Sequence, residues 1–337
     1  MATIHDVAAH AGVSAATVSR VMNDHASVNA EMASKVRAAI AELSYRPSHV
    51  ARSLRTQRTG IVAVVVPDVE NPFFTAVVRG IEDVARSAGL MAVLCNSDDQ
   101  PAAELRYLRL IDDQRVDGVI LASSMSDASG FQMTAGKGLP PLVLIDRDVP
   151  GIRCDLVLVD NRTGAREATR HLLDQGATRL ACITGPANVS TAVQRLEGFL
   201  DALEERGISR RDAVVRFADF RAQGARAALE DILSHTKPDA LLVGNNVMTL
   251  GALQELASQG IRIPQDMLLA GYDDEPWSAS WHPAITTVAQ PAREVGKAAM
   301  RLLVQRLEDA TLPIQHITMQ PTLHVRESSL GVGPESA

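Results

Sequence analysis

The 337-residue chain is poor in cysteine and has no metal-binding pattern. Its three cysteines are Cys95, Cys154 and Cys182, an odd number scattered without the spacing of metal ligands. A disulfide framework and a metal site are therefore not expected. We interpret the three residues as core thiols of a cytosolic protein.

The chain also lacks long hydrophobic runs. No apolar stretch reaches the length that a membrane span requires. The N-terminus starts with a helix-capping pattern instead of the basic and then apolar segments of a secretory signal. We therefore expect a cytoplasmic location and no membrane partner.

Motifs for common enzyme chemistry are missing as well. There is no Gly-x-Gly-x-x-Gly after a strand, no P-loop and no Gly-x-Ser-x-Gly elbow. His235 and His282 are isolated. Asp273 and Asp274 are neighbours, so on an extended segment they point apart and do not form a catalytic dyad. We expect no enzymatic activity and no cofactor.

The charge of the chain is unevenly distributed. The net charge is −7, and 46% of the residues are hydrophobic, which with this length allows two or three domains. Residues 1–60 hold seven Arg and Lys residues against four acids, which gives +3 there and leaves −10 for the remainder. The basic head has the sign needed to approach phosphates, and the acidic body is repelled by them.

The first 22 residues predict two short helices joined by a turn. Apolar residues recur at helical spacing, first at Ile4, Val7, Ala8 and Ala11 and then at Val13, Val18, Val21 and Met22. Thr3 and Asp6 form a capping-box pattern at the first helix, and Ser14 is a natural cap of the second. Gly12 suits a left-handed residue between them. The pattern indicates a helix-turn-helix.

The second of these helices has the composition of a recognition helix. Its outward residues are small or polar, namely Ala15, Ala16, Thr17, Ser19 and Arg20. Small residues let the backbone approach the major groove, and Arg20 can reach guanine edges or phosphate. A third helix over Glu31–Leu43 would close the core through Val36, Ala39, Ile40 and Leu43. The alternative is a helical hairpin that only packs.

The residues that follow favour the DNA-binding interpretation over the packing hairpin, because residues 2–74 resemble the lactose/galactose-repressor family without a gap. The resemblance is carried by the helix-turn-helix, by Tyr45-Arg46-Pro47-Ser48 and by the Arg-rich segment 49–60. It implies a hinge helix over Ser48–Arg55 that folds on operator DNA, with Leu54 wedged into the minor groove. Otherwise Leu54 would be an ordinary linker residue. The DNA-binding residues that we expect are Thr3, Ser14, Ala15, Ala16, Thr17, Ser19, Arg20, Asn23, Tyr45, Arg46, Val50, Ala51, Ser53, Leu54 and Arg55.

From residue 61 buried strands alternate with amphipathic helices. The first series predicts strands 61–66, 90–94, 118–122, 142–145 and 156–159, with helices 75–88 and 102–114 and a weaker one near Gly130. The second predicts helices 163–175, 193–206, 222–233 and 247–259, with strands 180–183, 214–217, 240–243 and 267–270. Alternation of this kind implies two doubly wound α/β subdomains with parallel sheets.

The order of these elements resembles the periplasmic-binding-protein-like core of the same repressor family. The resemblance implies a helix-turn-helix domain over 1–47, a hinge helix and linker over 48–60, and an effector-binding and dimerisation core over 61–337. It also implies crossings between the subdomains near Asp160, Gln290 and Gln320. Subdomain one would then hold 61–160 and 291–320, and subdomain two 161–290 and 321–330.

A ligand site is expected where the strands end, because ligands of open parallel sheets bind beyond the carboxyl ends. Arg and Asp side chains can hydrogen-bond hydroxyls there, and aromatic rings can cover an apolar face. Phe74 and Phe220 could instead belong to the core. By position and chemistry the expected effector-binding residues are Asn71, Phe73, Phe74, Arg147, Thr191, Arg195, Phe220, Asn246, Asp273 and Trp277.

We interpret the chain as a transcription regulator, a repressor that acts as a homodimer or tetramer. Its operator would be palindromic, with a central CG, because Ala15, Ala16 and Arg20 resemble the reading residues of members that bind such sites. Its effector would be a sugar or sugar acid. Purine-binding members carry an Arg at the position of Val189, which disfavours a purine. The alternatives are a solute-binding protein or a sugar-processing enzyme.

Overall fold

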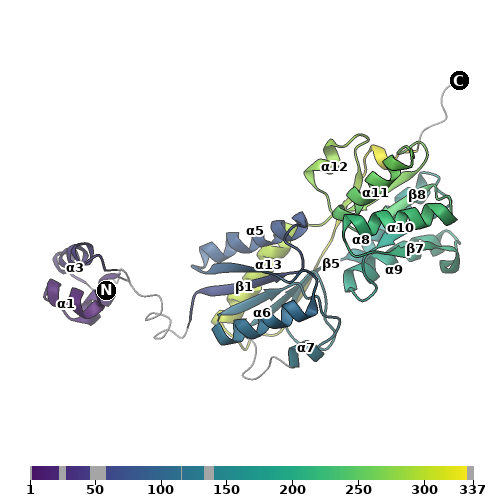
Figure 1. The fold of residues 1–337 in the computed structure, drawn as a ribbon. Helices are drawn as coiled ribbons and strands as arrows, with labels where there is room; N and C mark the ends of the chain where they lie inside the picture. The colour runs from purple at the N-terminus through teal and green to yellow at the C-terminus, as the bar shows by residue number, and fades with distance from the viewer. Residues whose placement is uncertain (1, 23–27, 46–57, 115, 133–139, 332–337) are drawn as a thin grey trace. The chain divides into compact units, whose positions relative to one another are not determined.

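The computed structural model describes the chain except residues 1, 23–27, 46–57, 115, 133–139 and 332–337. It has two units, Met1–Thr59 and Gly60–Ala337 (Figure 1). Seven of the residues expected to contact DNA lie outside the described residues, namely Asn23, Arg46, Val50, Ala51, Ser53, Leu54 and Arg55. Within the part that is described, no helix combines the length and the apolar character needed to cross a membrane.

The first unit contains three helices, α1 (Ile4–Ala11), α2 (Ala15–Met22) and α3 (Ala30–Glu42). The predicted capping box is confirmed, since Thr3 N donates to Asp6 Oδ2 at 2.8 Å and Asp6 N donates to Thr3 Oγ1 at 3.3 Å. Gly12 is left-handed with φ 66°, and Ser14 Oγ accepts from Thr17 N at 3.2 Å. The apolar sides of the helices meet in a core built on Val7, Val18, Val21, Val36 and Ala39.

The second unit begins with a parallel six-stranded sheet in the order β11-β5-β4-β3-β1-β2. Its strands are β1 (Ile61–Val66), β2 (Met91–Asn96), β3 (Gly118–Leu121), β4 (Leu142–Ile145), β5 (Asp155–Val159) and β11 (His316–Met319). The helices that accompany it are α5 (Pro72–Ser87), α6 (Pro101–Gln114), α7 (Ser129–Gln132) and α13 (Ala292–Glu308). We refer to this sheet and its helices as subdomain one.

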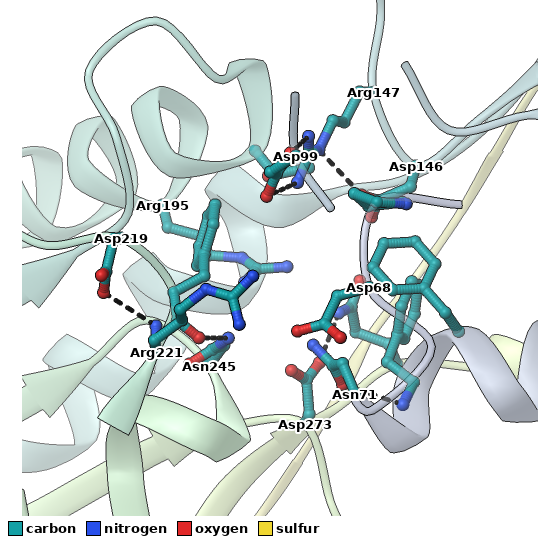
Figure 2. Close-up of a pocket in the computed structure, with 16 residues that line it drawn as sticks. Asp68, Asn71, Asp99, Asp146, Arg147, Arg195, Asp219, Arg221, Asn245 and Asp273 are labelled. Atoms are coloured by element: carbon teal, nitrogen blue, oxygen red, sulfur yellow. Dashed lines mark hydrogen bonds and ion pairs between the residues drawn. The ribbon is translucent and has the colours of Figure 1, made fainter. Parts of the chain in front are cut away.

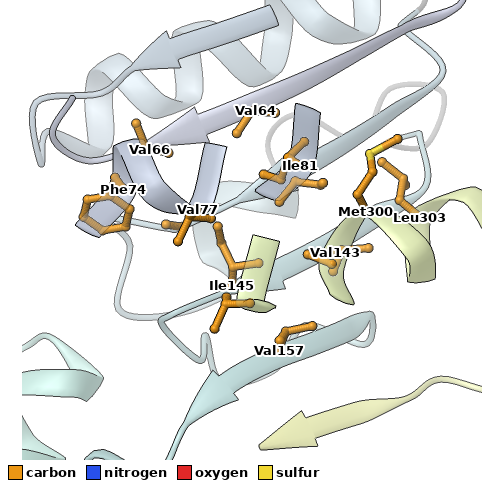
Figure 3. Close-up of a cluster of buried hydrophobic side chains, with 14 of the residues drawn as sticks. Val64, Val66, Phe74, Val77, Ile81, Val143, Ile145, Val157, Met300 and Leu303 are labelled. Atoms are coloured by element: carbon orange, nitrogen blue, oxygen red, sulfur yellow. The ribbon is translucent and has the colours of Figure 1, made fainter. Parts of the chain in front are cut away.

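The continuous apolar run of β1 is explained by burial on both faces of this sheet. Val62, Val64 and Val66 pack with α5 and α13, whereas Ala63 and Val65 pack with α6 on the other face. Figure 3 shows the first of these clusters, in which Phe74, Val77 and Ile81 of α5 and Met300 and Leu303 of α13 meet the strands.

The other sheet has the order β12-β10-β9-β8-β6-β7, and with its helices it forms subdomain two. Its strands are β6 (Leu180–Thr184), β7 (Val214–Phe217), β8 (Ala240–Val243), β9 (Leu268–Tyr272), β10 (Thr286–Ala289) and β12 (Thr322–His324). Its helices are α8 (Asn161–Asp174), α9 (Ser190–Glu205), α10 (Ala222–His235), α11 (Asn246–Ser258) and α12 (Pro276–Ser280), with 3-10 turns at Arg210–Asp212 and Glu327–Ser329. The predicted parallel pairing holds except that β12 is antiparallel to β10.

The chain passes between the two sheets three times. It leaves the first sheet after β5, returns to it between β10 and α13, and leaves it again between β11 and β12. Asp160 marks the first passage and caps α8, because its Oδ1 accepts from Thr163 N at 3.0 Å. Elements α12, β10, α13, β11 and β12 were not among those predicted from periodicity.

The cysteines are free thiols in the structure. Burial raises the pKa of Cys154 to about 11 and that of Cys182 to about 12, so both thiols are protonated at neutral pH. Across the described ranges, no group of three or more His, Cys, Asp or Glu side chains is arranged to hold a metal ion.

Helices α5 and α13 lie side by side although they come from opposite ends of the core (Figure 1). Two glycines allow this close approach. A Cβ atom at Gly80 would lie 2.0 Å from Arg293 O, and one at Gly296 would lie 2.0 Å from Val77 O. Each helix therefore places a glycine directly against the backbone of the other.

We expect Gly80→Ala to destabilise the protein, because the added methyl group must push two backbones apart. Overpacking of this kind costs about 1–3 kcal/mol. The control is Arg86→Ala, at an exposed position of the same helix, which should change the unfolding free energy by less than about 0.5 kcal/mol. Urea unfolding followed by circular dichroism measures both, and equal stabilities for the two variants would contradict the close helix contact.

Candidate ligand site and nucleic-acid interface

In the helix-turn-helix, the residues of α2 that were predicted to face outward are exposed or half-buried. Ala16 and Arg20 are exposed and Ala15, Thr17 and Ser19 are half-buried, whereas Val18 and Val21 face the core. The hydroxyls of Thr3 and Ser14 are engaged at helix starts, since Thr3 Oγ1 donates to Asp6 at 2.8 Å and Ser14 Oγ lies 2.9 Å from Thr17 Oγ1. Tyr45 packs against the three-helix core. Arg20 is therefore an exposed cationic side chain in the last turn of α2.

A pocket lies between the two subdomains at the carboxyl ends of both sheets (Figure 2). Residues after strands of subdomain one form one wall, and residues from subdomain two form the other. The lining residues are Pro67, Asp68, Asn71, Phe73, Phe74, Asp99, Asp146, Arg147, Thr191, Arg195, Asp219, Phe220, Arg221, Asn245, Asp273 and Gln290.

Four lining residues have left-handed backbones directly after or close to a strand end, and one of them is Asp99 beyond β2, with φ 53°. Asp146 follows β4 with φ 63°, Asp273 follows β9 with φ 65°, and Phe220 lies just beyond β7 with φ 62°. Asp146 N donates to Val157 O of β5, and Asp273 N donates to Val288 O of β10, so in both sheets the next strand holds the unusual residue. Non-glycine residues in this region are strained and persist where the surrounding structure fixes them, which is common at binding sites.

Arg147 is a buried cation on the subdomain-one wall. Its Nη1 donates to Asp99 Oδ1 at 2.5 Å and to Ser123 O at 3.2 Å, and its Nε lies 3.6 Å from Asp146 Oδ2. Burial raises the pKa of Asp146, and the nearby Arg147 opposes that rise. The guanidinium is also 5.9 Å from the centre of the Phe220 ring on the opposite wall.

Arg195 is the equivalent buried cation on the subdomain-two wall, in the second turn of α9. Its Nε donates to Asn161 Oδ1 at 2.8 Å, and its Nη1 donates to Gly244 O. The guanidinium stacks on Tyr272 with its carbon 4.0 Å from the ring centre. Its position is therefore fixed before any ligand binds.

Asp273 is a buried acid on the same wall as Arg195. Burial raises its pKa, although Arg195, Gln290 and the backbone of Asn246 oppose the rise. Gln290 Nε2 donates to Asp273 Oδ1 at 2.5 Å, while Gln290 Oε1 is buried without a hydrogen-bond partner. Asp274 points away and binds Arg326, which confirms the prediction that the two acids diverge.

The charges of the pocket balance without a surplus of positive charge. Its lining includes three arginines and five aspartates, at positions 68, 99, 146, 219 and 273. Arg147 is paired with Asp99, and Arg221 donates to Asp98 at 2.6 Å. Arg195 has no carboxylate among its hydrogen-bond partners and is held by Asn161, Gly244 and the ring of Tyr272. The pocket thus offers many donors and acceptors for hydroxyl groups, and an anion would meet more acids than arginines.

The two walls are in contact across the pocket. Arg221 reaches Asp98, Asn246 Nδ2 donates to Asn71 Oδ1 at 3.2 Å, and Asp148 N donates to the hydroxyl of Ser190 at 3.2 Å. The space enclosed is about 30 Å³, which is room for one or two water molecules. A sugar-sized ligand therefore requires the walls to separate, after which it would replace contacts between the subdomains with its own.

Eight of the ten residues expected to bind effector line this pocket, namely Asn71, Phe73, Phe74, Arg147, Thr191, Arg195, Phe220 and Asp273. Phe73 and Phe74 also belong to the core of subdomain one. Asn246 lies behind the lining, bound to Asn71. Trp277 does not line the pocket. Short helix α12 turns its indole onto the apolar cluster of α10 and α11, edge-on to Trp281 at 6.2 Å.

The remaining lining residues were not among those expected to bind the effector. They include four acids and Arg221, which carry most of the charge of the pocket (Figure 2). Asp68 and Asp146 stand in segments directly after β1 and β4, so their position after a strand was a usable signal. Asp219 lies as close to the end of β7, and Gln290 directly follows β10, a strand that was not predicted. Asp99 and Arg221 lie farther from their strand ends.

Comparisons with known proteins agree with both parts of the structure. Residues 3–48 match the family model described as bacterial regulatory proteins, lacI family, and residues 169–329 match the periplasmic binding protein-like domain. The chain is 38% identical to the ribose operon repressor of Halalkalibacterium halodurans, over 98% of either protein. It is 34% identical to the HTH-type transcriptional repressor PurR of Photobacterium profundum, over 97% of this chain and 98% of that protein.

Solved structures are similar over the whole chain or over the core. The Lac repressor dimer bound to operator and the anti-inducer ONPF is 27% identical, with a TM-score of 0.86 and coverage of 98% of this chain and 99% of that one. A LacI family transcriptional regulator from Enterococcus faecium with bound ribose is also 27% identical, with a TM-score of 0.74. It covers 81% of this chain and 100% of that one.

Asp274 holds the loop that carries Asp273, and we expect its contribution to stability to depend on pH. Burial opposes its ionisation, but hydrogen bonds from Arg326, Thr287 and His324 outweigh that effect and lower its pKa below the ordinary 3.8. A lowered pKa in the folded state stabilises the protein above the unfolded pKa, and this stabilisation is lost as the pH falls.

Asp274→Asn should therefore be less stable than the native protein at neutral pH, and the difference should shrink as the pH falls through 3.8. The control is Glu205→Gln, which removes the exposed pair with Arg170 and should change stability little. Urea unfolding at several pH values measures both. A difference that stays constant from pH 7 to pH 3 would show that the charge of Asp274 does not stabilise the loop.

Proposed function

The chain belongs to the lacI family of bacterial regulatory proteins, and from this premise we propose that an uncharged sugar, with ribose as the first candidate, controls its binding to operator DNA. The protein is a DNA-binding transcriptional repressor and not an enzyme. The relationship spans 98% of the chain, which sets aside the solute-binding protein and the sugar-processing enzyme. Operator DNA is chromosomal, so we also propose that the protein works in the cytoplasm.

The ion pairs of Arg147 and Arg221, together with the excess of acids over arginines in the lining, support an uncharged ligand. A carboxylate or phosphate needs a cation whose charge is not already neutralised, whereas Arg147 and Arg221 have acid partners and Asp146 and Asp273 lie near Arg195. An anion entering the pocket would also meet five aspartates. Hydroxyl groups suit the same surroundings, because they donate to carboxylates and accept from guanidinium groups. We therefore favour a neutral sugar over a sugar acid.

Two further observations favour ribose over a purine. The relative with 38% identity is named a ribose operon repressor, and a similar structure contains bound ribose. The PurR relative is 34% identical, but Val189 is a buried apolar residue where purine-binding members carry an arginine. In this proposal Asn71, Arg147, Arg195 and Asp273 bind the hydroxyls. The rings of Phe73, Phe74 and Phe220 cover the apolar face, Thr191 contacts the sugar, and Asn246 supports Asn71 from behind.

The edge of subdomain one supports the homodimer. Strand β2 is the last strand of its sheet, and it exposes Met91, Val93 and Leu94 by 57%, 42% and 44%. Edge strands with large exposed apolar side chains are usually covered by a partner. The similar Lac repressor structure is a dimer on its operator. We propose that this edge pairs with a second copy, which would place two recognition helices on a palindromic operator.

The connection to the DNA-binding unit supports control from the pocket. Gly60 precedes β1, and its N donates to Asp117 Oδ2 at 2.9 Å, so the linker enters subdomain one at a fixed point. A sugar that contacts both walls would change the angle between the subdomains. It would thereby change the orientation of subdomain one, which carries the linker. Because coupling is reciprocal, operator DNA must change sugar affinity by the same factor.

Ribose should bind the purified protein, and calorimetry should show weaker binding for variants that remove a hydroxyl partner. Loss of one charged hydrogen-bonding group costs about 1.5–3 kcal/mol, so Asp273→Asn and Arg195→Lys should each weaken ribose binding by about tenfold or more. Both variants should bind operator normally. Glu205→Gln is the control and should keep native affinity. Tighter binding of ribose 5-phosphate or gluconate than of ribose would contradict the neutral-sugar proposal.

Arg20→Ala should reduce operator affinity by about 1–3 kcal/mol and relax base choice, because a guanidinium in the major groove reads base edges. The control is Lys35→Ala, which also removes one positive charge from the same unit. Lys35 lies on α3 and is paired with Glu31. Leu54→Ala should lose specific affinity while binding random DNA as before. Fluorescence anisotropy on specific and random duplexes at two salt concentrations measures all three. Equal losses on both duplexes for Arg20→Ala would remove it from base reading.

A further inference from the structure

Glu104 is a buried acid that does not line the pocket. It lies on α6 with none of its surface exposed. Its Oε1 accepts from Ser123 Oγ at 2.7 Å, and its Oε2 accepts from Ser124 N at 2.5 Å. Burial raises its pKa, and these hydrogen bonds from the serines oppose the rise. Ser123 and Ser124 lie in the loop just after β3, so Glu104 fixes that loop through two hydrogen bonds.

The same loop holds Arg147 from its other side. Arg147 Nη1 donates to Ser123 O at 3.2 Å, in addition to its pair with Asp99 (Figure 2). The carbonyl of Ser123 and the N–H of Ser124 belong to one peptide unit. Because a trans peptide is planar, its N–H and C=O point in opposite directions. A carboxylate that fixes the N–H on one side therefore aims the carbonyl at the guanidinium on the other.

The loop has a second anchor that leaves little freedom for this peptide. Ser124 Oγ lies 3.1 Å from Ser97 Oγ, and Ser97 Oγ donates to Val66 O at 3.3 Å. Met125 N donates to Ser123 Oγ at 3.0 Å. The ends of β1, β2 and β3 are thus linked through side-chain hydroxyls, and Glu104 is the charged group to which they connect. A buried carboxylate costs stability unless its hydrogen bonds are complete, and an apolar residue would fill the space more cheaply.

We propose that Glu104 is a positioning residue for effector binding: it orients the Ser123–Ser124 peptide, and this peptide places the Arg147 guanidinium in the pocket. The proposal rests on the proposed sugar site, because Arg147 is one of its hydroxyl partners. Glu104 itself touches no ligand. Its contribution passes through one peptide plane and one hydrogen bond, which distinguishes it from a residue that only fills the core.

Glu104→Gln keeps the size of the side chain but replaces an acceptor with an NH₂ donor. In one orientation the donor meets the N–H of Ser124, and in the other it donates to the Ser123 hydroxyl while a neutral amide oxygen, a weaker acceptor than a carboxylate, accepts from Ser124 N. In both orientations the peptide is held less firmly than in the native protein. We expect ribose affinity to fall by about tenfold in calorimetry, while operator affinity without ribose stays native. The matched control is Asp155→Asn. Asp155 is a buried acid of the same sheet that does not line the pocket, and its Oδ1 lies 2.8 Å from Arg306 Nη2. The control variant should lower stability and leave ribose affinity unchanged.

A double-mutant cycle separates positioning from a merely structural role. If Glu104 acts through Arg147, then Glu104→Gln should cause no further loss of ribose affinity when it is added to Arg147→Ala. Additive losses would overturn the proposal, because they would show two independent effects. Equal losses of ribose affinity for Glu104→Gln and Asp155→Asn would also overturn it.

A ligand-free measurement keeps this test separate from the identity of the effector. In a crystal structure of full-length Glu104→Gln without sugar, we expect the 123–124 peptide to be rotated and the hydrogen bond from Arg147 to Ser123 O to be lost. An unchanged peptide and an unchanged Arg147 would overturn the proposal whatever sugar binds. Conversely, a native protein that binds no ribose would contradict the proposed effector, while the position of Arg147 in the variant would still test the role of Glu104.

Discussion

The structure of the core depends on one constraint, that two parallel sheets direct their carboxyl ends into the same space. The backbone at the end of a parallel strand has no partner strand beyond it, so polar groups gather there. In both sheets the chain turns at this point through a left-handed aspartate, Asp146 after β4 and Asp273 after β9, and the neighbouring strand binds the N–H of each. The pocket is the consequence of this repeated arrangement, and the three passages between the sheets keep its two walls opposite one another.

This constraint also determines the electrostatics of the pocket. Arg147 and Arg195 are each 5% exposed, and a buried guanidinium is tolerated only when its hydrogen bonds and its charge are satisfied. The protein satisfies Arg147 mainly with Asp99 and Ser123, and Arg195 with Asn161, Gly244 and the ring of Tyr272. Because these partners belong to the protein, both arginines are oriented in advance, and the charge of Arg147 is also paired with Asp99. Such a site selects ligands by the geometry of hydroxyl groups more than by charge.

Sequence reasoning was most successful where local chemistry decides the structure. The caps at Thr3 and Ser14, the turn at Gly12 and the buried strands such as Ile61–Val66 follow from neighbouring residues, and the structure contains them. Periodicity shows which side of an element is buried but not what it is buried against. Trp277 illustrates this limit, because an indole after a strand suits a pocket and a core equally well. Glu104 illustrates it too, since an acid in an amphipathic helix looks exposed until Ser123 and Ser124 are placed beside it.

In the proposed control of DNA binding, the rigidity of each wall determines how a small ligand could affect the DNA-binding unit. Side chains such as Arg147 and Arg195 are held by their own subdomains, so a sugar that binds both cannot be accommodated by local side-chain movement alone. The adjustable part is the set of contacts between the walls, which includes Arg221 with Asp98 and Asn246 with Asn71. Both are single interactions between polar side chains, the first of them exposed and thus weak. A ligand can therefore shift the angle between the subdomains at modest cost, and β1 transmits that shift to the linker that precedes it.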